Sequence, residues 1–175
     1  ALPIWSLDVE AALERVRNRA TAMTASTELS DASSVLFQQF RRLEIGVARA
    51  SVGIFDDEDA SAVELWTTFS SAHEEVKILD YVSIYAHRVL EDAVRARDAG
   101  LPYSVTRLSG DEVTLFYQTL SRGPGTEDGP AHPDTEYHYA FFFPGGMLTA
   151  IAHDQLSAAE CGEMERFASV FEIGR

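Results

Sequence analysis

The chain has 175 residues, of which 46% are hydrophobic, and its formal net charge is −14 at pH 7. This length and apolar content fit one soluble domain with a core of its own. No apolar run approaches the roughly 20 residues of a membrane span, and binding to a phosphate backbone requires clustered lysines and arginines that this acidic chain lacks. We therefore expect no membrane insertion and no nucleic acid partner.

The single cysteine, Cys161, has no partner for an intramolecular disulfide. This usage suits a reducing compartment and predicts a cytoplasmic protein. Lys77 is the sole lysine, and the other positively charged side chains are arginines. An acidic surface with few lysines is typical of a salt-rich cytoplasm, although a GC-rich genome also depletes lysine. Both explanations stay open.

The first predicted helix runs from Ser6 to about Ser26. Its apolar residues recur at steps of 4, 3, 4 and 3, which places them on one stripe of the helix. The same spacing forms the seam of a coiled coil, so the stripe packs either within the domain or against a second copy. We expect a homodimer through the terminal helices, with residues 1–12 as a candidate helical linker. The stripe residues are Val9, Leu13, Val16, Ala20 and Met23.

A second helix is predicted from the N-cap signal Ser30-Asp31 to Leu43. The segment from Val47 to Phe55 then alternates small apolar residues with a polar set that includes Arg49 and Ser51, which predicts a strand. The acidic run from Asp56 to Asp59 lacks the spacing of a calcium loop and is interpreted as a solvated hairpin connection. The returning strand is predicted from Ala62 to Phe69.

The middle of the chain predicts a weaker strand from Val76 to Val82, a helix from Ser83 to Ala99 and a strand from Tyr103 to Leu108. A capping-box pattern at Ser109 to Glu112 predicts the start of another helix. The polar segment from Arg122 to Thr135 is rich in glycine and proline and is predicted to be a mobile loop.

Two β-prone runs, Glu136 to Phe143 and Met147 to His153, meet at Pro144-Gly145-Gly146 and predict an antiparallel hairpin. Tyr137, Tyr139, Phe141 and Phe143 share one side of the first run, and His138, Ala140 and Phe142 share the other. Neither side is a regular polar row, so both faces of the sheet are expected to be covered. A second capping box, Ser157 to Glu160, predicts the last helix.

The expected fold is therefore α+β, a single domain over residues 1–175 with an antiparallel sheet of about six strands. The element order and three segments resemble the GAF domains of bacterial sensor histidine kinases: ERVRNRATAM, LEIGVARASVGIFD running into ELWTT, and FPGGMLTAIAHDQLSAAECGEMERFASVFE. The resemblance spans Leu13 to Ile173. It implies that the terminal helices pack on one face of the sheet, with the middle helices and loops over a pocket on the other face.

Three specialised GAF activities lack their signatures. The Asn-Lys-x-x-Phe-x-x-x-Asp-Glu pattern of cyclic-nucleotide binders does not occur. Bilin-binding relatives use a pocket cysteine, whereas Cys161 falls on the last predicted helix, and the methionine sulfoxide reductases need more than one thiol. Haem ligation by His87 or His138 has no supporting spacing, and a hydrogen-bonded structural role is the simpler interpretation. The cofactor is left unknown.

Strand alternation selects the walls of the expected pocket. If the small apolar set of the first strand faces the terminal helices, Arg49 and Ser51 face the pocket, and the same reasoning assigns Glu64, Trp66 and His138 to it. A shift of one residue would invert each assignment. Arg49 or Arg107 would pair with an anionic ligand and Trp66 would stack on a planar one. The candidate ligand-binding residues are Arg49, Ser51, Glu64, Trp66, Arg107 and His138.

No Gly-x-Ser-x-Gly elbow and no phosphate-binding glycine loop before a helix occur in the sequence, so no catalytic residue is expected. The first functional interpretation is a sensory domain that binds an unidentified small molecule and acts on an attached kinase or cyclase through its terminal helices. The alternative is a ligand-free dimerisation and relay module whose pocket is filled by aromatic side chains. An enzyme of GAF fold ranks third.

Overall fold

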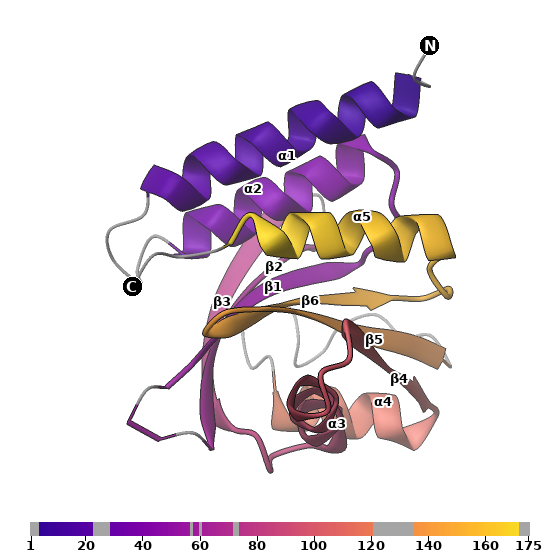
Figure 1. Ribbon diagram of the computed structural model, residues 1–175. Helices are drawn as coiled ribbons and strands as arrows, with labels where there is room; N and C mark the ends of the chain where they lie inside the picture. Colours follow the sequence, from indigo (N-terminus) through magenta and orange to yellow (C-terminus); the bar gives the residue numbers. More distant parts are fainter. Residues whose placement is uncertain are drawn as a thin grey trace.

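The computed structural model describes residues 4–22, 29–56, 58–59, 61–71, 74–120 and 135–171. Within these ranges, helices cover both faces of one sheet (Figure 1). The helices are α1 (Ile4–Ala22), α2 (Leu29–Arg42), α3 (Arg88–Asp98), α4 (Asp111–Thr119) and α5 (Ala158–Ser169). The strands are β1 (Arg49–Phe55), β2 (Ala62–Ser71), β3 (Glu74–Ser83), β4 (Tyr103–Ser109), β5 (Thr135–Phe143) and β6 (Gly146–Ala152).

The sheet has six strands in the order β3-β2-β1-β6-β5-β4, and every neighbouring pair is antiparallel. Helices α1, α2 and α5 lie on one face, and α3 and α4 lie on the other (Figure 1). The α+β class, the six antiparallel strands and the grouping of the terminal helices are therefore confirmed. Strand β3, the weakest of the strand predictions, is a full edge strand of 10 residues.

The central hairpin forms as predicted, with Gly145 at a φ of 85° in the turn between β5 and β6. A left-handed φ of this kind favours glycine. Tyr139 and Phe141 pack on the side of the terminal helices, whereas Ala140 and Phe142 pack on the side of α3 and α4. The two predicted faces of this strand are therefore confirmed.

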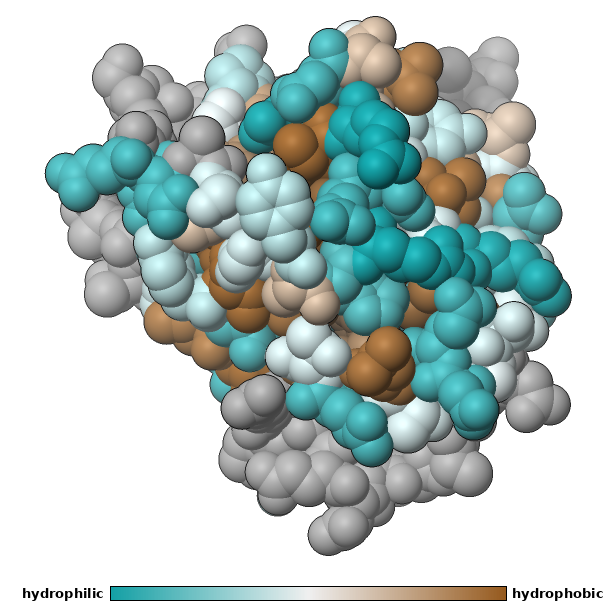
Figure 2. All heavy atoms as spheres, turned by 90° about the horizontal axis from the view of Figure 1, so that it is seen from below, coloured by the Kyte–Doolittle hydropathy of each residue, from teal (hydrophilic) through white to brown (hydrophobic). Residues whose placement is uncertain are grey.

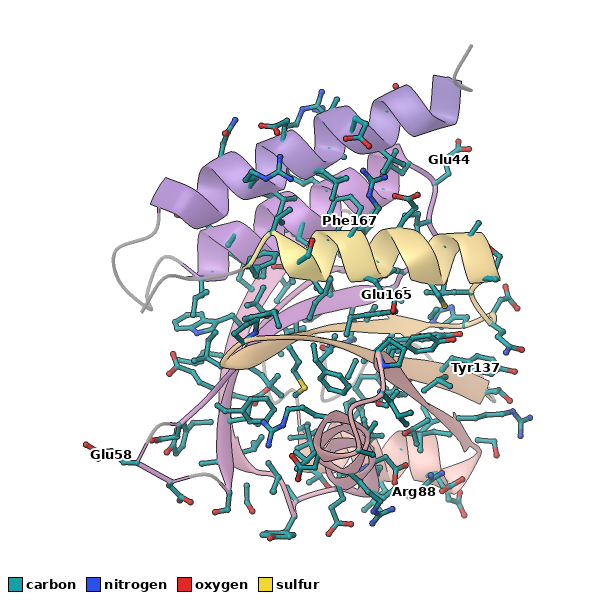
Figure 3. All side chains as sticks on the ribbon, viewed as in Figure 1. Glu44, Glu58, Arg88, Tyr137, Glu165 and Phe167 are labelled. Carbon is teal, nitrogen blue, oxygen red and sulfur yellow. The ribbon has the colours of Figure 1, made fainter. Side chains whose placement is uncertain are left out.

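Two hydrophobic cores lie on opposite sides of the sheet, and side chains fill both spaces (Figure 3). The core beneath α1, α2 and α5 includes Phe40, Phe141 and Phe167, all fully buried. The second core, beneath α3 and α4, is smaller and includes Leu90 and Leu108. Burial on both faces explains why the strands carry apolar residues at nearly every position.

The apolar stripe of α1 is buried in the core of the same chain. Val9, Leu13 and Val16 are at most 2% exposed and belong to the core that α1 shares with α2 and α5. The outward positions of α1 include the exposed Asp8 and Glu10. The spacing that suggested a dimer seam thus reflects an ordinary core-facing helix, and the part of α1 before residue 13 packs with the domain. The side chain of Ala20, Met23 and the predicted end near Ser26 lie outside the described residues.

Local signals place some helix ends correctly and others not. The capping box of α5 is present: the side chain of Ser157 accepts from the Glu160 amide, and the Glu160 side chain accepts from the Ser157 amide. The pattern at Ser109 forms only in part. Gly110 rather than Ser109 is the N-cap residue of α4, and no side chain caps it. The carboxylate of Glu112 accepts from the Ser109 backbone amide and also from the Arg88 guanidinium, at 2.7 Å.

Helix α3 starts at Arg88, five residues after the predicted start. Strand β3 continues to Ser83, and His87 then takes the extended conformation of an N-cap residue. The Nδ1 atom of His87 accepts from the Val89 amide at 3.1 Å. His87 therefore has the structural, hydrogen-bonded role that the sequence favoured.

Candidate functional site

Strand β1 presents its two polar residues to α3 and α4, as the alternation predicts. Ala50 and Val52 belong to the core of the terminal helices, so Arg49 and Ser51 point the other way. The guanidinium carbon of Arg49 lies 4.7 Å from the ring centre of Tyr117 on α4. The hydroxyl of Ser51 is hydrogen-bonded to that of Thr67 at 2.7 Å.

The predicted pocket positions of Glu64 and Trp66 are wrong. Trp66 lies opposite Val52 in the β1–β2 ladder and packs against the core of the terminal helices. Its indole Nε1 donates to the Glu64 carboxylate at 2.8 Å, so both side chains share that face. Directly opposed residues of two strands project on the same side, and the observed register places Leu65 and Thr67 on the pocket face instead.

Arg107 is also outside the pocket. It is exposed on the edge strand β4 and lies opposite Tyr137, whereas its neighbour Thr106 lies opposite His138. Its backbone oxygen accepts from the guanidinium of Arg88, which lies on the outer side of the α3–α4 layer (Figure 3). Among the candidates, Arg49, Ser51 and His138 are brought together on the pocket face, and Arg107, Glu64 and Trp66 are not.

A small cavity of about 40 Å³ lies between the sheet and the α3–α4 layer. A cavity of this volume holds about three water molecules. Its floor carries hydroxyl groups from several strands and its roof is apolar, with Leu90 and Phe116 from the two helices. The lining residues with polar side chains are Ser51, Thr67, Asp80, Ser104, His138, Tyr139 and Thr149.

The outer surface of this layer is mostly polar. Figure 2 shows that hydrophilic side chains dominate the face below α3 and α4, with separate hydrophobic patches between them. The exposed apolar side chains of this region include Leu101 and Leu115, each 53% exposed. The layer that covers the cavity therefore has a largely hydrophilic outer surface.

A buried polar cluster lies beside the cavity and was not predicted from the sequence. The hydroxyl of Tyr117 donates to Glu136, at 2.9 and 3.0 Å from the two carboxylate oxygens. Nε2 of His138 donates to the same carboxylate at 3.1 Å. Glu136 is 1% exposed and His138 is 4% exposed. A buried carboxylate of this kind requires donors on its oxygens, and α4 and β5 supply them.

Hydrogen bonding keeps Glu136 ionised. Burial by itself raises the pKa of this carboxyl, but the hydrogen bonds from His138 and Tyr117 outweigh burial, and the pKa lies below its ordinary value. Burial and the nearby Glu136 charge raise the pKa of Tyr117. The phenol therefore stays protonated and remains a donor.

Arg49 completes the cluster. Its guanidinium lies between two rings, 3.8 Å from the centre of Phe69 and 4.7 Å from the centre of Tyr117. Burial lowers the pKa of Arg49, and the neighbouring Tyr117 and Glu136 counteract this. The side chain of Tyr117 is hydrogen-bonded to the guanidinium, whereas the buried Nη1 atom has no hydrogen-bond partner among the residues that the structure describes. Arginine nevertheless keeps its charge in proteins.

The rings of His87 and His138 both pack against the ring of Phe116. The Phe116 ring centre is 5.4 Å from that of His87 and 4.4 Å from that of His138. Burial, followed by the neighbouring His138 and Arg88, lowers the pKa of His87, which favours the neutral imidazole. Its Nδ1 atom already accepts the N-cap bond of α3.

The acidic connection between β1 and β2 forms a turn. The Asp56 carboxylate accepts from the amides of Glu58 and Asp59, and Glu58 projects away from both helix layers (Figure 3). Asp57 lies outside the described residues. Across the part of the chain that the structure describes, no three His, Cys, Asp or Glu side chains gather as a metal site would require.

Cys161 lies on α5 and is buried in the core of the terminal helices. It is therefore on the opposite side of the sheet from the cavity, as its position in the sequence predicted. The predicted mobile loop from Arg122 to Thr135 lies, up to residue 134, outside the described residues.

Comparison with known proteins places the fold. No family model matches the chain, and no curated protein matches it in sequence. A solved structure described as the structure of the GAF domain superposes with a TM-score of 0.56, at 11% sequence identity, over 96% of this chain and 87% of that one. The chain therefore has a GAF-like fold. Among the helices of the described residues, none is long and apolar enough to cross a membrane.

Proposed function

We propose that this chain is the sensory domain of a bacterial signal-transduction protein, with a small molecule as its signal. The observation that carries the proposal is the internal cavity, which has hydroxyl groups and His138 on its floor and lies next to a buried charged cluster. Ligand sites are concave, mostly apolar and furnished with a few converging polar groups. This cavity has that composition, and a ligand larger than about three waters would displace the side chains of α3 and α4.

Hydrogen bonds offer a route from the cavity to the terminal helices. Thr67 lines the cavity, and the adjacent Thr68 is hydrogen-bonded on the other face to Ser33 of α2 at 2.7 Å. His138 lines it as well, and the hydroxyl of the adjacent Tyr139 accepts from the Leu156 amide, just before α5, at 2.9 Å. Neighbouring strand residues point to opposite faces. A shift of β2 or β5 on the cavity side would therefore change the hydrogen bonds that these strands make with α2 and with the segment before α5.

The output domain belongs to the same proposal. A sensor histidine kinase, or a related two-component protein in the cytoplasm, is the partner that the GAF resemblance favours. Ligand state would then bias two packings of the helices on the far face, and the ligand must bind one packing more tightly than the other. Autophosphorylation of the full-length protein, measured with and without a binding compound, tests this part.

The ligand-binding proposal is tested by a thermal-shift screen of small metabolites against the domain and a variant with a filled cavity. Ala93 lines the cavity and is buried, so Ala93→Met occupies part of its volume. Ala159→Met makes the same change at an exposed position of α5 and is the control. A compound that raises the melting temperature of the wild-type and Ala159→Met proteins, but not that of Ala93→Met, supports a cavity ligand.

The second candidate is a relay module that binds no ligand. The small cavity favours it, because Leu90, Phe116 and Leu120 already fill most of the space under α3 and α4. On this interpretation no compound shifts the melting temperature, and Ala93→Met keeps full output in the intact protein. Either role permits a homodimer through α1 and α5, but its interface would have to use outward positions of these helices.

A further inference from the structure

Strand β3 leaves one side of its backbone unpaired. It is the outermost strand of the sheet (Figure 1), has 10 residues and pairs with β2 without a break. Its sequence contains no proline, and its ladder contains no bulge. Proteins usually shorten, bulge, cover or interrupt an edge strand, because its free N–H and C=O groups can bind another strand. A long and regular edge such as β3 is therefore a site for a further strand.

The odd-numbered residues of β3 direct their backbone groups away from the sheet. The amide of Ile84, directly after β3, donates to the carbonyl of Ser61, directly before β2, at 2.7 Å. Residues of an antiparallel ladder alternate between bonding to the partner strand and pointing away from it, so the even-numbered residues bond to β2. The Ser83 carbonyl accepts from the Ala86 amide, and the other outward groups bond to no residue that the structure describes. The outward residues are Glu75, Lys77, Leu79, Tyr81 and Ser83.

This edge also exposes apolar side chains. Leu79 is 50% exposed and Tyr81 is 61% exposed. Leu79 lies opposite Trp66 of β2, which packs against the core of the terminal helices and is only partly buried. The opposite edge of the sheet, β4, has 7 residues, and the carbonyl of Arg107 on it already accepts from the Arg88 guanidinium of α3. Of the two edges, β3 is therefore the more open and the more apolar.

The charges along β3 suit a second copy of the same strand. On the side of the terminal helices, the charged residues Glu75 and Lys77 lie in the first half of the strand, and the second half, from Leu79 to Ser83, carries no charge. An antiparallel pair places the first half of each copy against the second half of the other. Like charges then stay apart, which favours association of two chains that each carry a net charge of −14.

We propose that two copies of this chain form a symmetric dimer by antiparallel pairing of their β3 strands, with the two Leu79 residues opposite each other on the two-fold axis. In this register each outward residue meets an outward residue of the other copy, because Lys77 lies opposite Tyr81 and Glu75 lies opposite Ser83. The free backbone groups of both edges are thereby paired. The exposed apolar side chains of the two edges also meet, and the two sheets become one.

The neighbouring registers bring like charges together. A dimer centred on Ile78 would make the two Lys77 side chains diagonal neighbours, and one centred on Lys77 or on Asp80 would oppose like charges directly. In the proposed register the two Asp80 carboxylates lie diagonally on the cavity side. The positive charge of Arg49 near each of them opposes their repulsion. The register centred on Leu79 is therefore the most favourable of these.

Sedimentation of the purified chain over a range of concentrations tests the dimer, in about 1 M potassium chloride to screen repulsion between the copies. We expect the wild type to form a dimer. Leu79→Asp opposes two carboxylates on the axis and should weaken the dimer about tenfold or more. Val105→Asp adds the same charge at a residue of β4 that is 46% exposed and is the control. Circular dichroism shows whether both variants are folded.

Disulfide formation tests the register. Directly opposed residues that exchange hydrogen bonds have Cα atoms about 5.5 Å apart, which a disulfide can span. Oxidised glutathione should therefore link Leu79→Cys into a covalent dimer. Lys77→Cys lies on the same exposed edge but away from the axis, so it should remain unlinked. The native Cys161 is buried on α5 and is retained in both variants.

A wild type that stays monomeric, or that forms assemblies larger than two copies, would overturn the β3 dimer. A dimer that folded Leu79→Asp leaves unchanged would also overturn it and would favour pairing through the outward positions of α1 and α5. Equal linking of the two cysteine variants would refute the register. If Leu79→Asp does not fold, the cysteine pair decides the case. Leu79, Lys77 and Val105 do not line the cavity, so the ligand proposal is tested separately.

Discussion

The hydroxyl of Tyr117 on α4 lies 2.9 and 3.0 Å from the two carboxylate oxygens of Glu136 on β5. This contact joins the helical cover of the cavity to the sheet through a carboxylate that is 1% exposed. His138 donates to the same group. The attachment of α4 therefore depends on polar contacts as well as on the apolar residues around it.

Tyr117→Phe should lower the free energy of unfolding by about 1–3 kcal/mol, because it removes a donor from a buried charge and leaves the ring in place. Urea denaturation followed by circular dichroism measures this change. Tyr85→Phe deletes a hydroxyl from a side chain that is 69% exposed and is the control. Equal midpoints for the two variants would mean that Tyr117 does not stabilise Glu136.

The decrease of the free energy of unfolding at acidic pH should depend on Glu136. The pKa of this carboxyl is lower in the folded protein than its ordinary value of 4.5. The ionised Glu136 therefore contributes its full stabilisation of the folded state at pH values above the unfolded pKa, and this stabilisation is lost as the pH falls through the folded pKa. Glu136→Gln should make stability less dependent on pH below about 4.5. Urea midpoints at a series of acidic pH values measure this, with the exposed Glu44→Gln as a charge-matched comparison.

Two glycines should respond in opposite directions to alanine. A Cβ atom at Gly146 would lie 2.3 Å from the Gly53 carbonyl oxygen and 2.6 Å from the Phe143 ring, whereas one at Gly162 on α5 would meet nothing within 4 Å. Gly146→Ala should destabilise the domain by about 3 kcal/mol or more. Gly162→Ala should stabilise it by up to about 1 kcal/mol, because alanine favours a helix interior. Thermal unfolding of both variants tests the pair.

The acidic composition predicts salt-dependent stability. At a net charge of −14, repulsion among carboxylates is screened as the Debye length falls from about 10 Å at 0.1 M salt to about 3 Å at 1 M. The melting temperature should therefore rise from low to molar potassium chloride. An unchanged melting temperature would remove the argument for a salt-rich source.

Leu13→Ala tests whether the apolar stripe of α1 packs within the domain or against a second copy of the chain. Leu13 is 2% exposed within the chain, so its truncation should cost about 2–5 kcal/mol of unfolding free energy. If the stripe packs only internally, the truncation leaves the association of the chain unchanged, and sedimentation of both proteins gives the same mass. A wild-type dimer that Leu13→Ala converts to a folded monomer would restore the coiled-coil interpretation.

Several features followed from the sequence because they rest on local chemistry or on short-range alternation. The Ser157–Glu160 capping box formed within one turn of helix, and the β5–β6 hairpin formed around a glycine in the left-handed region. Arg49 and Ser51 alternate with the small residues Ala50 and Val52, so the two faces of β1 differ in the sequence itself. For these elements, the residues that decide the structure are near neighbours in the chain.

Only the tertiary structure decided the faces of β2 and the composition of the cluster. Leu65 and Phe69 alternate with Trp66, so each side of this strand carries large apolar residues, and a sheet buried on both faces accepts either orientation. The pairing of Val52 with Trp66 settled the choice. Tyr117 and Glu136 come from separate elements, and their contact exists because α4 packs over the end of β5. Such contacts depend on how elements pack across the sheet, which local sequence patterns do not encode.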